Sequence, residues 1–288
     1  MRVLVTGSSG LLGGAVAALL GERHEVVGLD RVAGPATSVV GGVEDRAVVR
    51  RAARGVEAVV HIASLHAPHV AEASREQFFA VNVTGTRHLL EAAVEAGVRR
   101  FVYTSTTSVY GASLVPDAAA VWVDEDLPPV PRDVYDETKL AAEALCSRFA
   151  DEAGMPAIVL RTGRFFPEPP MVAAIHRLYR GIDVRDVAAA HALAVENDAI
   201  TFDVFNVVAC SPFHRQDAPG LLADAPAVIR RRCPEVASAF AALGWPLPGS
   251  IDRVYDGRKA ERGLGFRPIH DIAALLRDQA AGDPVAGR

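Results

Sequence analysis

The chain has 288 residues, half of them hydrophobic, so it can bury the core of one large domain with a smaller lobe. Its 30 Lys and Arg residues against 35 Asp and Glu residues argue against a general basic surface for nucleic acid or an anionic membrane. No stretch has the length of a signal sequence or a membrane span, and we expect a cytoplasmic protein. Three scattered cysteines without a Cys-x-x-Cys motif predict neither a disulfide framework nor a thiolate metal site.

The first predicted elements are a strand, a glycine-rich turn and a helix. An apolar run over 2–5 is followed by Gly7, Gly10 and Gly13 and then by a helical stretch over 15–20. Such glycines allow a tight bend, a close approach of the backbone to a pyrophosphate, and tight packing of the helix on the strand. This pattern predicts a dinucleotide-binding turn.

The second predicted strand, 25–29, ends in Asp30. A carboxylate at this distance from the glycines can accept hydrogen bonds from the adenosine ribose hydroxyls and repels a 2′-phosphate. The position therefore favours NAD over NADP, although Arg31 beside it partly offsets that preference.

Strands and helices continue to alternate after this point. Residues 39–42 and 57–62 are predicted strands, and 45–54 between them is a predicted helix. Alternation of this kind predicts a parallel sheet, which binds its ligand at the carboxyl ends of the strands.

Two histidines, His66 and His69, follow the fourth predicted strand. They lack a third ligand, so we predict no metal site. A substrate contact by His66 is the interpretation that we favour.

A long helix is predicted over 75–97, with Gly97 as its end. Asn82 and Gly85 inside it reduce helix stability, so each needs a local reason, such as an amide contact or the close approach of a cofactor. The next strand, 101–103, leads into hydroxyl-rich residues that are predicted to face the same crevice.

Tyr135 and Lys139 stand four residues apart in a strongly helical segment and so share one helix face. An ammonium about one turn away favours the phenolate form of a tyrosine, as does the positive ring of an oxidised dinucleotide. Tyr135 is therefore predicted to act as an acid and base near neutral pH.

Six motifs together resemble the extended short-chain dehydrogenase/reductase family, also called NAD-dependent epimerase/dehydratases. They are Thr6 to Gly13, Asp30, His61 to Ser64, Asn82 to Thr86, Tyr103 to Gly111 and Tyr135 to Lys139. The resemblance implies an α/β Rossmann fold, a doubly wound parallel sheet with a small C-terminal substrate lobe. It also implies that Tyr135 is the acid and base and that Lys139 holds the nicotinamide ribose and lowers the tyrosine pKa. Thr106, with Ser105 as its neighbour, would bond the reacting oxygen.

With NAD as the expected cofactor, the predicted cofactor-binding residues are Gly7, Ser9, Gly10, Leu11, Gly13, Asp30, Arg31, Val43, His61, Ala63, Asn82 and Lys139. The predicted substrate contacts are His66, Thr107, Arg164 and Arg177. No metal is predicted.

The sequence departs from the nucleotide-sugar members of the family. Arg164 replaces an expected Asn, residues 245–249 replace an arginine phosphate clamp, and the segment 167–183 is short. The residues around Arg164 resemble those of uronate dehydrogenases, compact members that oxidise a free sugar acid. We therefore expect a substrate smaller than a nucleotide sugar, with any anionic part held by Arg164 or Arg177. Either arginine could instead pair with Glu168 or Asp183.

The later elements are a helix opening at Asp183 and running to about 196, a strand over 202–208, and a helix over 259–264. Asp183 is predicted to be an N-cap, with Asp186 completing the capping arrangement. Three consecutive arginines, Arg230 to Arg232, are predicted to form a solvated helix face.

The predicted division places residues 1–164 and 183–208 in the NAD-binding domain. Residues 165–182 and 209–288 form the substrate lobe, and 282–288 is a loose tail.

The sequence thus predicts a NAD-dependent oxidoreductase or epimerase that acts at a secondary alcohol or hemiacetal of a small, carbohydrate-like substrate. One alternative is a nucleotide-sugar 4-epimerase or dehydratase with tightly bound NAD. An alternative of another class is a catalytically silent dinucleotide sensor. As in relatives, we expect a homodimer that pairs the helices over 75–97 and 135–153.

Overall fold

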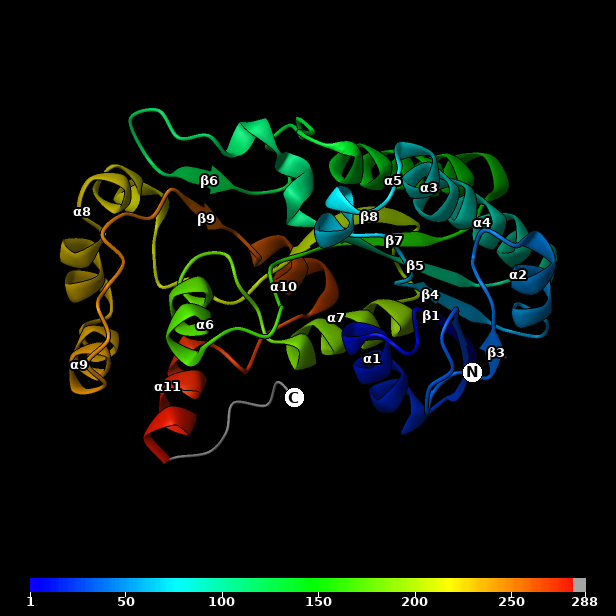
Figure 1. The fold of residues 1–288 in the computed structure, drawn as a ribbon, viewed down its shortest axis with the longest axis horizontal. Coiled ribbons are helices and arrows are strands. Elements are labelled where there is room, and N and C mark those ends of the chain that lie inside the picture. The colour runs from blue at the N-terminus through cyan, green and yellow to red at the C-terminus, as the bar shows by residue number, and fades with distance from the viewer. Residues whose placement is uncertain (282–288) are drawn as a thin grey trace.

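The computed structural model describes residues 1–281. Its main sheet has seven strands in the order β3-β2-β1-β4-β5-β7-β8, and all neighbours are parallel (Figure 1). The strands are β1 (Arg2–Thr6), β2 (Glu25–Asp30), β3 (Val39–Val40), β4 (Ala58–His61), β5 (Arg100–Thr106), β7 (Ala157–Thr162) and β8 (Phe202–Val207). The chain reverses its direction of winding between β1 and β4, where a doubly wound sheet binds its ligand. The predicted fold class is confirmed.

Helices cover both faces of this sheet (Figure 1). One face carries α1 (Leu11–Gly21), α7 (Val184–Glu196) and α10 (Arg258–Leu264), and the other carries α2 (Arg46–Ala52), α4 (Gly85–Ala96) and α5 (Val134–Ala153). Because both faces are covered, the central strands carry buried apolar runs, and all four residues of β4 are buried. In α1, Leu12, Val16 and Leu20 recur at helical spacing and point into the core.

The segment predicted as one long helix is divided into three parts. These are α3 (Arg75–Phe78), a π-helical stretch (Phe79–Thr84) and α4, which ends at Gly97 in the left-handed conformation. A side chain at Gly85 would lie 2.6 Å from the Val43 side chain. The Asn82 amide group bonds both the N–H and the C=O of Leu65, at 2.8 and 2.9 Å. Both irregular residues therefore have local reasons, and the π-helical stretch is a feature that the sequence pattern did not predict.

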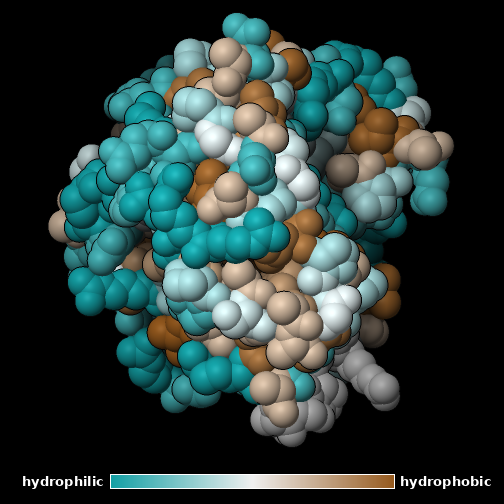
Figure 2. Space-filling model, turned by 90° about the vertical axis from the view of Figure 1, so that its left-hand side faces the viewer, coloured by the Kyte–Doolittle hydropathy of each residue, from teal (hydrophilic) through white to brown (hydrophobic). Residues whose placement is uncertain are grey.

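The small lobe lies beside the carboxyl ends of the strands (Figure 1). It contains α6 (Pro170–Arg177), α8 (Ala218–Arg232), α9 (Pro234–Ala242) and α11 (Ile272–Ala281), and a parallel pair of strands, β6 (Val121–Val123) and β9 (Arg253–Tyr255). Its own core includes Leu221, Ile229 and Phe240. Figure 2 shows the outer face of this lobe, where hydrophilic residues cover much of the surface and hydrophobic ones lie among them. Short 3₁₀ turns span Ala67–Ala71, Thr107–Tyr110, Ala112–Leu114 and Arg215–Asp217.

The main domain and the lobe exchange more elements than the predicted domain boundaries imply. Strand β6 comes from within 1–164 but pairs with β9. Helix α10 comes from within 209–288 but packs on the main sheet through Ala260 and Leu264. The expected tail, 282–288, lies outside the described residues. Within residues 1–281, no helix is both long enough and apolar enough to cross a membrane.

Two predictions near the lobe need correction. Asp183 caps α7 as predicted, accepting from the Arg185 N–H at 2.9 Å, but Asp186 accepts instead from the backbone N–H groups of Ile269 and His270. It therefore joins α7 to the chain before α11. The solvated face predicted for the three arginines is present only in part: Arg231 is exposed, but both it and the more buried Arg232 bind the buried Asp217. Arg230 is exposed.

Candidate active site

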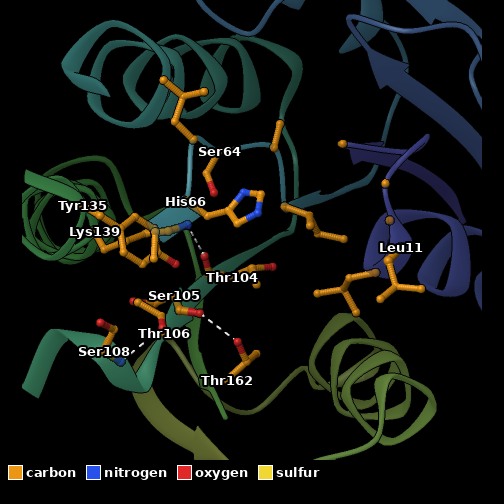
Figure 3. Close-up of a pocket in the computed structure, with 18 of the residues that line it drawn as sticks. Leu11, Ser64, His66, Thr104, Ser105, Thr106, Ser108, Tyr135, Lys139 and Thr162 are labelled. Carbon is orange, nitrogen blue, oxygen red and sulfur yellow. Dashed lines mark hydrogen bonds between the residues drawn. The ribbon is translucent and has the colours of Figure 1, made fainter. Parts of the chain in front are cut away.

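A cavity of about 950 Å³ opens at the carboxyl ends of the strands, and both the main sheet and the lobe contribute to its wall. One end is lined by the glycine-rich turn after β1 and by the end of β2. The middle is lined by β5 and the first turns of α5. The other end is lined by residues of the lobe. Figure 3 shows the middle of the cavity, with Tyr135, Lys139 and Thr106 grouped on the side away from Leu11.

The glycine turn is closely packed against its own helix. Gly7 has φ 73°, in the left-handed region that favours glycine, and a side chain on Gly13 would lie 1.9 Å from the Gly7 carbonyl oxygen. Asp30 lies directly beside this turn: its carboxylate accepts from the N–H of Ser9 and the N–H of Val32, both at 2.9 Å. The predicted residues that line this end are Gly7, Ser9, Gly10, Leu11, Gly13, Asp30, Arg31, Val43 and Ala63. Bare backbone, a carboxylate and apolar walls fit the parts of a dinucleotide.

His61 lies behind the cavity wall and does not line it. The Thr6 hydroxyl oxygen accepts from the N–H groups of Ile62 and Ala63, so its proton is directed to His61 Nδ1, at 2.8 Å. The Nε2–H of His61 then donates to the Thr86 hydroxyl, at 2.9 Å. The neutral ring thus ties β1 to β4 and to the helix beyond. Burial lowers the pKa of His61 to about 3.

Asn82 also lies outside the cavity wall, with a side chain that is buried. Besides Leu65, it bonds the Thr138 hydroxyl of α5, at 3.0 Å. The direct cofactor contacts predicted for His61 and Asn82 are therefore corrected to a positioning role. The polar atoms of both side chains are already used in buried hydrogen bonds, so they are not available to a cofactor. These bonds hold loops that do line the cavity.

Tyr135 and Lys139 occupy consecutive turns at the start of α5, which Asp133 caps by accepting from the Asp136 N–H at 2.9 Å. Both side chains are buried, and both line the cavity (Figure 3). The Lys139 ammonium donates to the Thr104 carbonyl at 2.9 Å and lies 5.9 Å from the centre of the Tyr135 ring. The predicted pairing on one helix face is present.

Burial, and not the pairing, dominates the protonation of these two groups. It raises the pKa of Tyr135, and interaction with the Thr106 hydroxyl opposes the rise only in part. Burial also lowers the pKa of Lys139 to about 7. Without the cofactor, burial thus moves the pKa of Tyr135 away from neutrality, because loss of water disfavours the charged form of each group. The role of Tyr135 as acid and base near neutral pH, which was expected to need the oxidised dinucleotide as well, stays a prediction.

Of the two hydroxyls predicted beside Tyr135, the structure favours Thr106. Its side chain lies at the end of β5 and accepts from the Ser108 N–H at 3.1 Å (Figure 3). Ser105 lines the cavity too, but its hydroxyl donates to Glu143 at 2.5 Å, and Glu143 also holds Arg161. Ser105 is therefore corrected from a catalytic neighbour to part of a buried ion-pair network.

The predicted substrate residues are only partly brought together. His66, Thr107 and Arg164 line the cavity, and the His66 ring stacks against Phe166 with centroids 5.8 Å apart. Arg164 donates to Glu168 at 2.5 Å. Arg177 does not line the cavity: it is buried and donates to Asp183 at 2.8 Å. The substrate contact predicted for Arg177 is wrong, since this arginine joins α6 to the start of α7.

Sequence reasoning missed several residues of the lobe end. Arg132, Phe166, Arg180, Arg253 and Tyr255 all line the cavity. Arg253 and Tyr255 reach it because β9 pairs with β6. No local pattern signals that pairing, so only the tertiary structure identifies these residues.

A glycine turn beside a carboxylate, followed along the same cavity by a buried tyrosine and lysine, defines a dinucleotide-binding protein of the short-chain dehydrogenase type. Residues 3–171 match the NAD dependent epimerase/dehydratase family, and the chain belongs to that family. The family and the cofactor expected from the sequence are thereby confirmed.

The relatives include both steroid and sugar enzymes. A 3-beta-hydroxysteroid dehydrogenase of Mycolicibacterium neoaurum is 38% identical over 173 residues, which are 56% of this chain and 46% of that protein. A uronate dehydrogenase of Pseudomonas putida is 28% identical over 175 residues, 58% of this chain and 62% of that protein. These matches thus span less than two thirds of either relative.

Among solved structures, a short-chain dehydrogenase/reductase superfamily protein from Agrobacterium tumefaciens with bound NAD is 27% identical. Its TM-score is 0.74, and the match covers 98% of this chain and 96% of that chain. The likeness thus extends over the lobe as well as the main sheet.

Proposed function

We propose that the protein is a NAD-dependent oxidoreductase or epimerase that transfers hydride at a secondary alcohol or hemiacetal of a small, carbohydrate-like substrate. The observation that carries the proposal is the grouping of Tyr135, Lys139 and Thr106 in one cavity with the glycine turn and Asp30. A silent dinucleotide sensor has no need of a buried tyrosine beside a hydroxyl.

The cofactor would be held by three parts of this chain. The turn from Gly7 to Gly13 supplies backbone N–H groups for the pyrophosphate, and Asp30 accepts from the adenosine ribose. Lys139 can donate to the nicotinamide ribose, since the Thr104 carbonyl uses only one of its three donors. Oxidised NAD supplies the hydride acceptor and a positive ring that favours the phenolate of Tyr135.

The remaining chemistry belongs to two side chains. Tyr135 takes the proton from the substrate hydroxyl, while the Thr106 hydroxyl donates a hydrogen bond to the same oxygen. Together they stabilise the negative charge that develops there. Because burial raises the pKa of Tyr135, this residue is protonated before the cofactor binds and is well suited to return the proton in the reverse direction.

The test is a screen of free sugars, uronic acids and nucleotide sugars with NAD, followed both by NADH absorbance and by analysis for isomeric products. We expect at least one compound to give NADH or an isomer, and Tyr135→Phe to give neither with that compound. A protein that binds NAD but reacts with no alcohol in the panel, under any condition of pH, would contradict the proposal and favour the sensor.

A further inference from the structure

Four arginines surround the lobe end of the cavity: Arg132, Arg164, Arg180 and Arg253. Three of them have a carboxylate partner. Arg132 lies 3.6 Å from Asp136, Arg164 lies 2.5 Å from Glu168, and Arg253 donates to Asp252 at 3.0 Å. Over residues 1–281, Arg180 forms no ion pair. Four guanidinium groups against three carboxylates leave one positive charge in excess, and it belongs to Arg180.

His176 holds Arg180 in place, and the hydrogen bonds determine how. His176 Nδ1 lies 2.6 Å from a Glu168 oxygen, and a carboxylate only accepts, so the ring proton is on Nδ1. Nε2 is then the acceptor for the Arg180 guanidinium, at 2.6 Å. A doubly protonated ring would present a donor to a donor. His176 is therefore neutral, which agrees with the effect of burial in lowering its pKa. The hydrogen bond between the two residues leaves the positive charge on Arg180.

The Arg180 guanidinium has N–H donors that are not used in hydrogen bonds within residues 1–281. Its bond to His176 is the single hydrogen bond of its guanidinium in the described part of the chain, and its Nε atom is shielded from solvent without a partner. The backbone on either side is firmly held: the Arg180 carbonyl accepts from the Arg164 N–H, and the Tyr179 carbonyl accepts from the Tyr255 N–H. The Arg180 guanidinium lies 5.5 Å from the centre of the Tyr179 ring but has no carboxylate partner among residues 1–281. An anion that enters the cavity would therefore stabilise this half-buried cation further.

We propose that Arg180 is the specificity-determining residue that receives an anionic group of the substrate, a carboxylate or a phosphate, with His176 as its positioning residue. The inference rests on the proposed function for the identity of the rest of the substrate. A guanidinium presents parallel N–H donors that match either anion, so a substrate with such a group gains both charge and geometry over its neutral analogue.

Binding to the NADH-loaded protein tests this without turnover, because an alcohol cannot be oxidised there. Calorimetric titrations compare two sugar acids, D-galacturonate and D-glucuronate, with the neutral sugars D-galactose and D-glucose. D-galactose 1-phosphate, compared with D-galactose, tests a phosphate in place of the carboxylate. We expect at least one anionic sugar to bind tenfold or more tightly than its neutral analogue. Arg180→Met should abolish that preference while leaving the affinity for the neutral sugar within about threefold. The matched control is Arg230→Met, an exposed arginine of the same lobe, which should keep the preference.

A parent protein without any preference for the anionic sugars would overturn the proposal, as would a preference that survives in Arg180→Met. For the positioning role, His176→Gln should retain most of the preference, since its amide oxygen can accept from Arg180, whereas His176→Leu should lose it. Equal effects of the two substitutions would contradict that role. Anion preference without hydride transfer would reject the proposed function alone, and turnover of neutral sugars without anion preference would reject this inference alone.

Discussion

Tyr135 and Lys139 lie within one turn of each other, and burial shifts their two protonation equilibria in opposite directions. The pKa of the phenol rises and the pKa of the ammonium falls. Burial thus disfavours the charged form of each side chain, and a positive charge from outside the pair is needed to favour the phenolate of Tyr135.

Tyr135→Phe should lower kcat by at least a thousandfold and leave NAD affinity within about threefold, because the substitution removes only the ionisable hydroxyl. Stopped-flow hydride transfer and fluorescence titration with NADH provide the two measurements. Turnover within tenfold of the parent would remove Tyr135 from the reaction.

Asp30 sets the cofactor preference at the other end of the cavity. We expect NAD to bind more tightly than NADP, and Asp30→Ala to reduce this difference in affinity, since the variant no longer repels a 2′-phosphate. Arg31→Ala is the matched control and should increase the difference in affinity. The prediction would fail if the parent protein bound the two cofactors equally in parallel titrations.

Lys139 should make the stability of the cofactor-free protein depend on pH. Its pKa is about 7 in the folded protein and 10.5 in the reference state, so between these values the unfolded chain binds a proton that the folded protein does not. The free energy of unfolding then rises with pH across this window, by about 1.4 kcal/mol per pH unit at most. Lys139→Met should remove this rise in urea unfolding curves, and parallel curves for parent and variant would contradict it.

At the scale of the elements, polar side chains that bridge neighbouring strands and helices hold the cavity wall in place. Thr6 and His61 join the ends of β1 and β4, and Asn82 joins the loop after β4 to α5. His191 of α7 joins the other face of the sheet to β5 through Thr104, at 2.8 Å. The bridges through His61 and His191 require a neutral ring, so acid should weaken the sheet at these two points, whereas the Asn82 amide does not titrate.

We expect the free energy of unfolding to fall as pH drops from about 6.5 toward 4. The folded pKa values of His61 and His191 are about 3 and about 4, below the reference value of 6.5, so the unfolded chain takes up protons first. Unfolding monitored by circular dichroism should show a smaller acid loss for His61→Gln than for the parent. His24→Gln, which alters an exposed contact with Glu196, should leave the loss unchanged. An acid loss in His61→Gln equal to that of the parent would contradict this explanation.

Much of the main sheet could be predicted because its signals are local. The glycine spacing after β1, Asp30 at the end of β2, and the position of Gly97 as a helix end depend on neighbouring residues. Ser105 and Arg177 were assigned wrongly because their partners, Glu143 and Asp183, are recognised only in three dimensions. Arg180 was missed for a related reason, since no local pattern shows that this arginine lines the cavity without a carboxylate partner among residues 1–281.

For the whole molecule, the homodimer stays a prediction. The resemblance to the family implies that α4 and α5 pair across a two-fold axis. Val94 of α4 is 40% exposed and would be covered by such a partner. Sedimentation at micromolar concentration should show a dimer, and Val94→Glu should shift it toward monomer. Val115→Glu, at a 73% exposed position outside these helices, should not. A parent protein that sediments only as monomer would remove the prediction.

The pairing of β6 with β9 also determines the order in which the molecule can be assembled. The glycine turn, Asp30 and Tyr135 all precede β7, so a chain emerging from the ribosome has these residues before β9 is made. Arg253 and Tyr255 lie on β9 itself, and β6 remains without a partner until that strand arrives. Closing so long a connection is slow relative to local folding. The lobe end of the cavity, to which β9 contributes Arg253 and Tyr255, is therefore completed last during synthesis, after the glycine turn and Tyr135.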